Sequence, residues 1–219
     1  MYEEDQVKRL IQLLAKAIVR LLRLLNDKDY GTARTELHYV LNELFGVSES
    51  MILGLSEEDV LDLIFKGAAA DPERVAVLAD VLRIAGETAA GEGNPDQAVQ
   101  WYQASLRYLV TATDKMGFRP SSETLRSFES VAGALLPGGM SADLLASLYA
   151  LYRGAGNHAL ASELIVAFTE MTHHEATGVE EARAYLTELS RREEGSLRQS
   201  GLSRERVAGM LAALSSNAA

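Results

Sequence analysis

The chain has 219 residues, of which 47% are hydrophobic and 24% charged, values typical of a globular protein with a core of its own. It contains no cysteine, which excludes disulfides, thiolate metal sites and a cysteine nucleophile. The net charge of −10 repels nucleic-acid phosphate, and no run of basic residues offsets it. We therefore expect no nucleic-acid partner.

The N-terminal segment predicts neither a secretory signal nor a membrane span. Residues 1–5 are acidic where a signal peptide would be basic. Residues 7–25 are rich in apolar side chains, but five lysines and arginines interrupt them, whereas a membrane-spanning helix needs about 20 mostly uncharged residues. We expect a cytoplasmic protein that is not inserted in a membrane.

Helical periodicity runs through almost the whole chain, and no long alternation of apolar and polar residues predicts a strand. In chain order, the pattern predicts helices over 3–26, 30–45 with a stop at Gly46, and 56–65 with Ser56 as N-cap. Further helix starts are marked by Asp71-Pro72, Asn94-Pro95, Ser122, Ser141 and Ser203.

The segment 193–203 carries two short stretches of glycine and serine and predicts a linker before a short last helix. This divides the chain into a domain of helical hairpins over 1–192 and a C-terminal linker with a short helix over 193–219.

Residues 79–112 carry the strongest internal pattern. Small residues that include Ala85 and Gly86 lie on one predicted helix, Gly93 lies in a turn, and Ala98 and Tyr102 lie on the next helix. This window resembles a tetratricopeptide repeat, a helix–turn–helix of about 34 residues. The resemblance implies that Ala98 faces Gly86 and that Tyr102 packs into a neighbouring hairpin.

Two further windows, 145–168 and 21–40, resemble the same repeat with larger residues at the small positions. The chain also resembles an uncharacterised bacterial family of all-helical, tetratricopeptide-like proteins. Together these resemblances imply an all-α fold, in which antiparallel helical hairpins form a tetratricopeptide-like right-handed array.

Tetratricopeptide-like proteins are usually interaction scaffolds, and a groove lined by the first helix of each hairpin often holds a peptide. The resemblance therefore implies a partner-binding groove that contains Asp80, Arg83, Glu87, Asp143 and Arg153. On the first helix the corresponding positions are apolar: Ile18, Leu22 and Leu25.

The predicted helix 3–26 has an apolar stripe that is wider than one neighbouring helix covers. Three interpretations stay open: a buried first helix of the array, the seam of a homodimer, or a helix that binds a membrane surface or a partner. Leu13 and Leu22 flank the heptad positions, so we assign them to the seam of a possible homodimer.

No residue pattern predicts a catalytic, cofactor or metal site. His173 and His174 are adjacent, and adjacent side chains on a helix diverge by about 100°, so both cannot bind one metal ion from a regular helix. Neither a phosphate-binding loop nor a nucleophile elbow is present. We predict a non-enzymatic interaction or scaffold protein with an unidentified protein or peptide partner. The alternatives are a membrane-surface adaptor that uses the N-terminal helix, or a helical enzyme whose site the sequence does not reveal.

Overall fold

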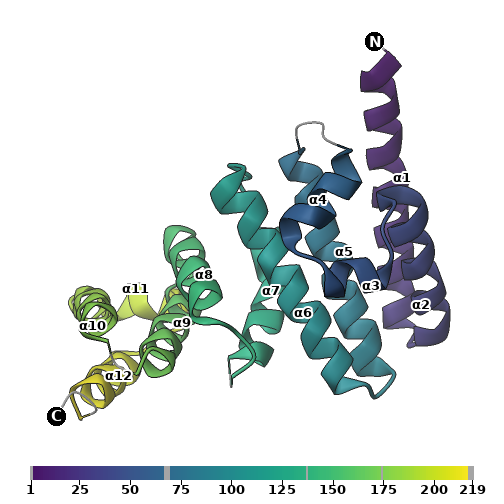
Figure 1. Cartoon of the computed structure of the whole chain (residues 1–219). Coiled ribbons are helices and arrows are strands. Elements are labelled where there is room, and N and C mark those ends of the chain that lie inside the picture. Colours follow the sequence, from purple (N-terminus) through teal and green to yellow (C-terminus); the bar gives the residue numbers. More distant parts are fainter. Residues whose placement is uncertain (1, 67–69, 137, 174, 217–219) are drawn as a thin grey trace. The chain divides into compact units, whose positions relative to one another are not determined.

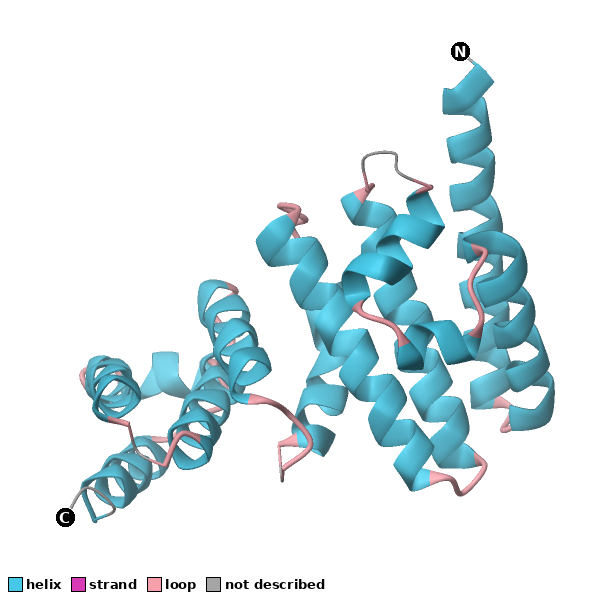
Figure 2. Cartoon of the chain, viewed as in Figure 1, coloured by secondary structure: helices cyan, strands magenta, loops and turns pink. Residues whose placement is uncertain are grey.

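The computed structural model describes the chain except for residues 1, 67–69, 137, 174 and 217–219. All regular secondary structure in the described residues is helical, which confirms the all-α prediction (Figure 2). The elements in chain order are α1 (Tyr2–Asn26), α2 (Tyr30–Tyr39), the π-helical η1 (Val40–Phe45), α3 (Glu49–Gly54), α4 (Glu57–Phe65), α5 (Pro72–Gly91), α6 (Pro95–Val110), the π-helical η2 (Thr111–Lys115), α7 (Ser122–Leu135), α8 (Ala142–Gly154), α9 (His158–Met171), α10 (Ala176–Ser190), α11 (Glu194–Gln199) and α12 (Arg204–Ser216).

Most helix starts carry the caps that the sequence predicts. The side chains of Ser56, Asp71 and Ser141 each accept a hydrogen bond from a backbone N–H in the first turn of α4, α5 and α8. The predicted cap Ser122 is wrong by one residue. Its neighbour Ser121 has extended backbone and accepts a hydrogen bond from Thr124 N at 3.1 Å, so Ser122 is the first residue of α7.

The chain divides into two compact units, residues 1–119 and 120–219. The predicted boundary between 192 and 193 falls inside the second unit. The predicted linker 193–203 is not a continuous loop, because α11 forms within it and buries Leu197 completely. Leu202, just after α11, is also buried, so apolar contacts order this glycine- and serine-rich segment.

In the first unit, α5 and α6 pack along each other on either side of a turn in which Gly93 has a φ of +77° (Figure 1). The ring of Tyr102 lies over Gly86, where it provides the atoms nearest to any added side chain. The expectation that Tyr102 packs into a neighbouring hairpin is therefore wrong for this contact, because Gly86 and Tyr102 belong to the same α5–α6 hairpin. A tyrosine ring fits over the backbone only because Gly86 has no Cβ.

Helices α1 and α2 pack against each other, and both contact α5. The predicted helix 30–45 is helical throughout, but its last part, η1, is π-helical and ends at Gly46, whose φ is +74°. The short α3 was not predicted; it begins at the cap Ser48 and contacts α6.

In the second unit, α8 and α9 form the most closely packed pair, α10 packs against α9, and α12 packs against α10. The core of this unit includes Tyr152, whose hydroxyl donates to the Leu125 carbonyl at 3.2 Å. None of the helices in the described part of the chain combines the length and apolar composition that crossing a bilayer requires.

Candidate functional site

Helix α1 buries one face and leaves apolar side chains exposed beside it. Leu14 and Leu21, one heptad apart, are 1% and 0% exposed. Leu13, Val19 and Leu22 are 44%, 68% and 42% exposed. The packing within the first unit therefore covers the centre of the predicted stripe but not its margins.

The two predicted seam residues lie on opposite sides of the buried face. Leu13 and Leu22 are nine residues apart, which at about 100° per residue is half a turn of helix. Leu22 shares its side with Val19, the exposed Ala15 and the half-buried Ile18. We call these four residues, Ala15, Ile18, Val19 and Leu22, the α1 edge. A homodimer interface along one side of α1 can therefore contain this edge or Leu13, but not both.

The predicted groove residues divide between the two units. On α5, Arg83 is 6% exposed; its Nε donates to Asp80 Oδ1 at 2.8 Å, and its guanidinium also pairs with Glu87. Burial and the nearby Glu87 carboxylate raise the pKa of Tyr102 on α6. These contacts make Arg83 part of the packing around the α5–α6 hairpin.

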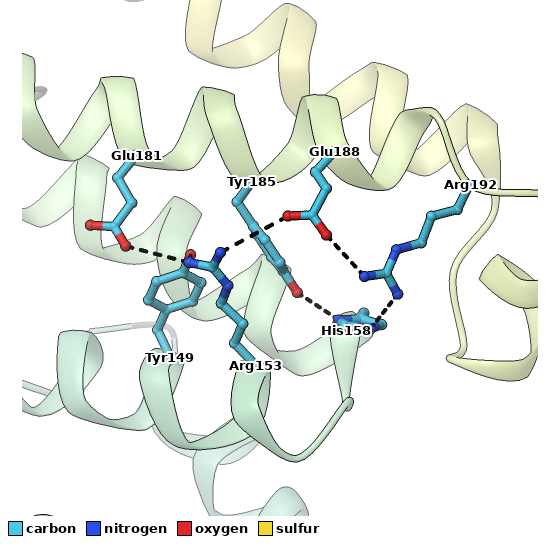
Figure 3. A network of polar contacts seen from close by, with 7 residues as sticks. All are labelled: Tyr149, Arg153, His158, Glu181, Tyr185, Glu188 and Arg192. Atoms are coloured by element: carbon cyan, nitrogen blue, oxygen red, sulfur yellow. Dashed lines mark hydrogen bonds and ion pairs between the residues drawn. The ribbon is translucent and has the colours of Figure 1, made fainter.

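On α8, the groove prediction names Asp143 and Arg153. Asp143 is exposed in the first turn of the helix. Arg153 lies in a network of polar side chains between α8, α9 and α10, which we call the α8–α10 cluster (Figure 3). Its members are Tyr149, Arg153, His158, Glu181, Tyr185, Glu188 and Arg192.

Arg153 lies between two tyrosine rings and two carboxylates. Its Nη1 donates to the Tyr149 hydroxyl at 2.9 Å, and its guanidinium carbon is 5.7 Å and 5.1 Å from the ring centroids of Tyr149 and Tyr185. Glu181 and Glu188 approach the guanidinium at 3.8 Å and 3.9 Å. These are cation–π contacts with longer ion pairs, and they connect α8 to α10.

His158, the first residue of α9, joins the same network. Its Nε2 lies 2.6 Å from Arg192 Nη1 and its Nδ1 lies 3.0 Å from the Tyr185 hydroxyl. Because a guanidinium only donates, Nε2 must accept, and the proton of a neutral ring then sits on Nδ1 and is donated to Tyr185. Burial, and secondly the Arg192 charge, lower the pKa of His158.

The cluster is balanced in charge and its polar groups satisfy one another. Arg153 and Arg192 face Glu181 and Glu188, and Arg192 Nη2 donates to Glu188 Oε1 at 3.0 Å. Burial raises the pKa of Tyr185 to about 12, so this hydroxyl keeps its proton near neutral pH. The arrangement fastens α10 to the α8–α9 pair.

Sequence reasoning found Arg153 but missed its partners. On α10, Glu181, Tyr185 and Glu188 follow one another at spacings of four and three residues, which is one face of a helix, and Arg192 follows four residues later, just beyond the end of α10. That spacing was the available signal, but it does not reveal which helix the face meets.

The predicted absence of a metal site stays a prediction. His173 is exposed and has a φ of +52°, so it lies in the turn after α9 and not on a helix. His174 lies outside the described residues. Within the part of the chain that the structure describes, no three His, Asp or Glu side chains are grouped to hold a metal ion.

Comparisons with known proteins give no assignment. No protein-family model matches the chain, and no curated protein or solved structure matches it either. The resemblance of 79–112 to a tetratricopeptide repeat therefore depends on the residues of that window alone.

Proposed function

We propose that this is a non-enzymatic protein-interaction or scaffold protein, built from tetratricopeptide-like helical hairpins in a bacterial-type cytoplasm. We further propose that it engages a protein partner through the α1 edge. The observation that carries the proposal is the exposure of Val19 and Leu22 beside the buried face of the same helix. Adjacent exposed apolar side chains are typical of interaction surfaces, whereas isolated ones are common everywhere.

Burial of the α1 edge by a partner would be favourable. Removing a valine or leucine side chain from water contributes roughly 1.5–3 kcal/mol when burial is complete. Val19 and Leu22 are already partly buried within the chain, so the free energy gained when a partner covers each of them is smaller than this. Several neighbouring apolar side chains must therefore be buried at the same time. Ala15 and Ile18 extend the apolar surface along the helix.

The charges near the edge favour a protein partner over a membrane surface, which is the second candidate. Lys16, Arg20 and Arg23 are exposed on α1 and would attract anionic lipid. Arg20 pairs with Glu36 at 3.2 Å, and Arg23 lies 3.8 Å from Asp27. These carboxylates offset two of the three cations, and the net charge of the chain is −10.

Gel filtration of lysate from the native host tests the proposal. We expect the wild-type chain to elute in an assembly larger than its own mass of 23.8 kDa, and the variant Val19→Glu with Leu22→Glu to elute as the single chain. A matched control is Gln100→Glu with Gln199→Glu, which adds the same charge at exposed positions elsewhere. Identical elution of wild type and edge variant would reject the proposal. Flotation of the wild type with anionic vesicles, lost in the edge variant, would favour the membrane adaptor.

A further inference from the structure

We propose that a cleft in the second unit binds a free α-amino acid with an uncharged side chain. The cleft lies between α7, the turn from α8 to α9 and the segment that ends α11, and its lining falls within residues 120–201. Its volume of about 590 Å³ is in the range of small-molecule sites. The cleft shares no residue with the α1 edge, so this inference is tested independently of the proposed function.

Two opposite charges line the cleft without pairing with each other. Arg126 and Glu129 are three residues apart on α7, which places them on one side of the helix, and both belong to the lining. Among the described residues no carboxylate pairs with the Arg126 guanidinium, whose Nε donates to the Ser122 carbonyl at 3.4 Å. A cation and an anion held apart in one cleft match a zwitterion, whose carboxylate binds Arg126 and whose ammonium group binds Glu129.

The spacing of these two charges fits an α-amino acid. Side chains three residues apart on a helix begin about 5–6 Å from each other. An α-amino acid carries its ammonium group and its carboxylate on one carbon atom, so it can bridge two side chains that begin this close together. A guanidinium can also donate two parallel hydrogen bonds to one carboxylate, which is a strong and directional arrangement.

The Glu129 carboxylate is already held in place. Asn157 Nδ2 donates to Glu129 Oε1 at 2.8 Å, and Asn157 Oδ1 accepts from Leu160 N at 3.2 Å, so the first turn of α9 fixes the amide that fixes the carboxylate. In the part of the chain that the structure describes, Glu129 Oε2 makes no hydrogen bond and can accept from a ligand. A carboxylate positioned in advance loses less conformational freedom when it binds.

The walls of the cleft are tied to one another. The Tyr152 hydroxyl donates to the Leu125 carbonyl at 3.2 Å and thereby joins α8 to α7. Gly201, which follows α11, has a φ of +76°, and a Cβ at this position would lie 3.3 Å from the Ala159 Cβ. The segment after α11 therefore packs directly on α9, and the cleft exists before a ligand enters it.

The rest of the lining selects an uncharged ligand side chain. Apart from Arg126 and Glu129, the described residues of the lining carry no charge. They include the hydroxyls of Ser122 and Ser200, and Ser200 Oγ donates to the Leu197 carbonyl at 2.8 Å, which leaves its oxygen able to accept. A further charge on the ligand would have no partner here and would lose part of its hydration.

Calorimetric titration of the purified full-length chain with L-glutamine and with L-serine tests the inference. We expect at least one of them to bind one to one with a dissociation constant below about 1 mM. L-glutamate matches L-glutamine in size but carries an extra negative charge, and it should bind at least about tenfold more weakly than the tighter of the two. Absence of binding by both L-glutamine and L-serine up to about 10 mM would overturn the inference, and L-glutamate binding as tightly would overturn the preference for an uncharged side chain.

Analogues of the ligand test the two charge contacts without changing the protein. The N-acetyl form of the amino acid that binds has no ammonium group, and its α-amide has no carboxylate. Each should bind at least about tenfold more weakly than the parent, because each leaves one charged group of the cleft without its partner. Undiminished binding of either analogue would overturn the zwitterion as ligand.

Variants assign each contact to its residue. Arg126→Gln and Glu129→Gln should each weaken binding at least about tenfold, and in Glu129→Gln the N-acetyl form should bind about as well as the parent amino acid. The glutamine at 129 still offers an oxygen to Asn157, and unfolding curves check that both variants are folded. Glu123→Gln is the matched control, since Glu123 is exposed in the first turn of α7 and is not part of the lining. Wild-type affinity in both cleft variants, or an equal loss in Glu123→Gln, would overturn the site.

Discussion

At Gly86 the contact between α5 and α6 leaves no space for a side chain. The Tyr102 ring occupies the space that a Cβ at this position would need. Gly86→Leu should therefore destabilise the protein by about 1–3 kcal/mol, as overpacking a close contact does. Urea unfolding measures the change.

Gly133 is the matched control for this prediction. It also lies within a helix, α7, but apart from its two chain neighbours and the backbone of that helix, no atom is within 4 Å of the place where its Cβ would be. Gly133→Leu should leave stability unchanged or raise it by up to about 1 kcal/mol, because glycine is a poor helix former. An equal effect of the two substitutions would contradict the importance of the Gly86–Tyr102 contact.

The start of α9 makes stability depend on pH through His158. The ring accepts from Arg192, and a proton on Nε2 would set two cations against each other at the N-terminus of a helix, where positive charge is unfavourable. The other charged groups facing it are Arg153 from α8, which also disfavours the proton, and Glu188 from α10, which favours it. Burial and the two arginines outweigh Glu188, so the pKa of His158 is lowered in the folded chain.

The sign of the pH effect follows from this lowered pKa. Well above pH 6.5, the ordinary pKa of histidine, the side chain is neutral in both the folded and the unfolded chain, and stability is unaffected. As pH falls below that value, the unfolded chain binds the proton first, so the free energy of unfolding decreases. Urea unfolding at pH 7.5 and 5.5 should show a smaller decrease for His158→Gln than for wild type. The exposed His38→Gln should behave as wild type, and the same decrease in all three proteins would contradict the assignment.

Arg153 fastens α10 to α8 through contacts that alanine cannot replace. Arg153→Ala removes the hydrogen bond to Tyr149 and the contacts with both rings and both carboxylates. We expect a loss of about 1–2 kcal/mol and faster hydrogen exchange in α10. Arg126→Ala is the control, since Arg126 is exposed and donates to the carbonyl of Ser122 in its own helix. Unchanged exchange in α10 would show that the α8–α10 cluster does not hold this helix.

For the molecule as a whole, the segment from α11 to α12 contributes side chains to the core of the second unit. Leu197, Leu202, Val207 and Leu214 are all buried, and α12 packs against α10. A chain that ends at residue 192 should therefore lose cooperative unfolding of the second unit, because α10 would expose the surface that α12 covers. Removing residues 216–219 alone is the control and should leave the melting curve unchanged. Retained cooperativity in the chain ending at 192 would instead support a separable C-terminal segment.

Much of the local structure was readable from the sequence, because the interactions that set it span only a few residues. The caps Ser56, Asp71 and Ser141 bond to N–H groups two or three residues ahead, and Gly46 ends its helix by adopting a left-handed conformation. The all-α class follows from periodicity along each helix. These features do not depend on which helices meet.

Tertiary structure decided what side chains from separate helices do together. Tyr102 lies over Gly86, 16 residues earlier, and α11 forms in a glycine- and serine-rich segment because Leu197 finds an apolar place in the core. The α8–α10 cluster joins His158 to Tyr185 and Arg192, 27 and 34 residues away. Periodicity identifies the face that a helix buries. Which other helix covers that face depends on the packing of the whole unit, and no local sequence pattern predicts it.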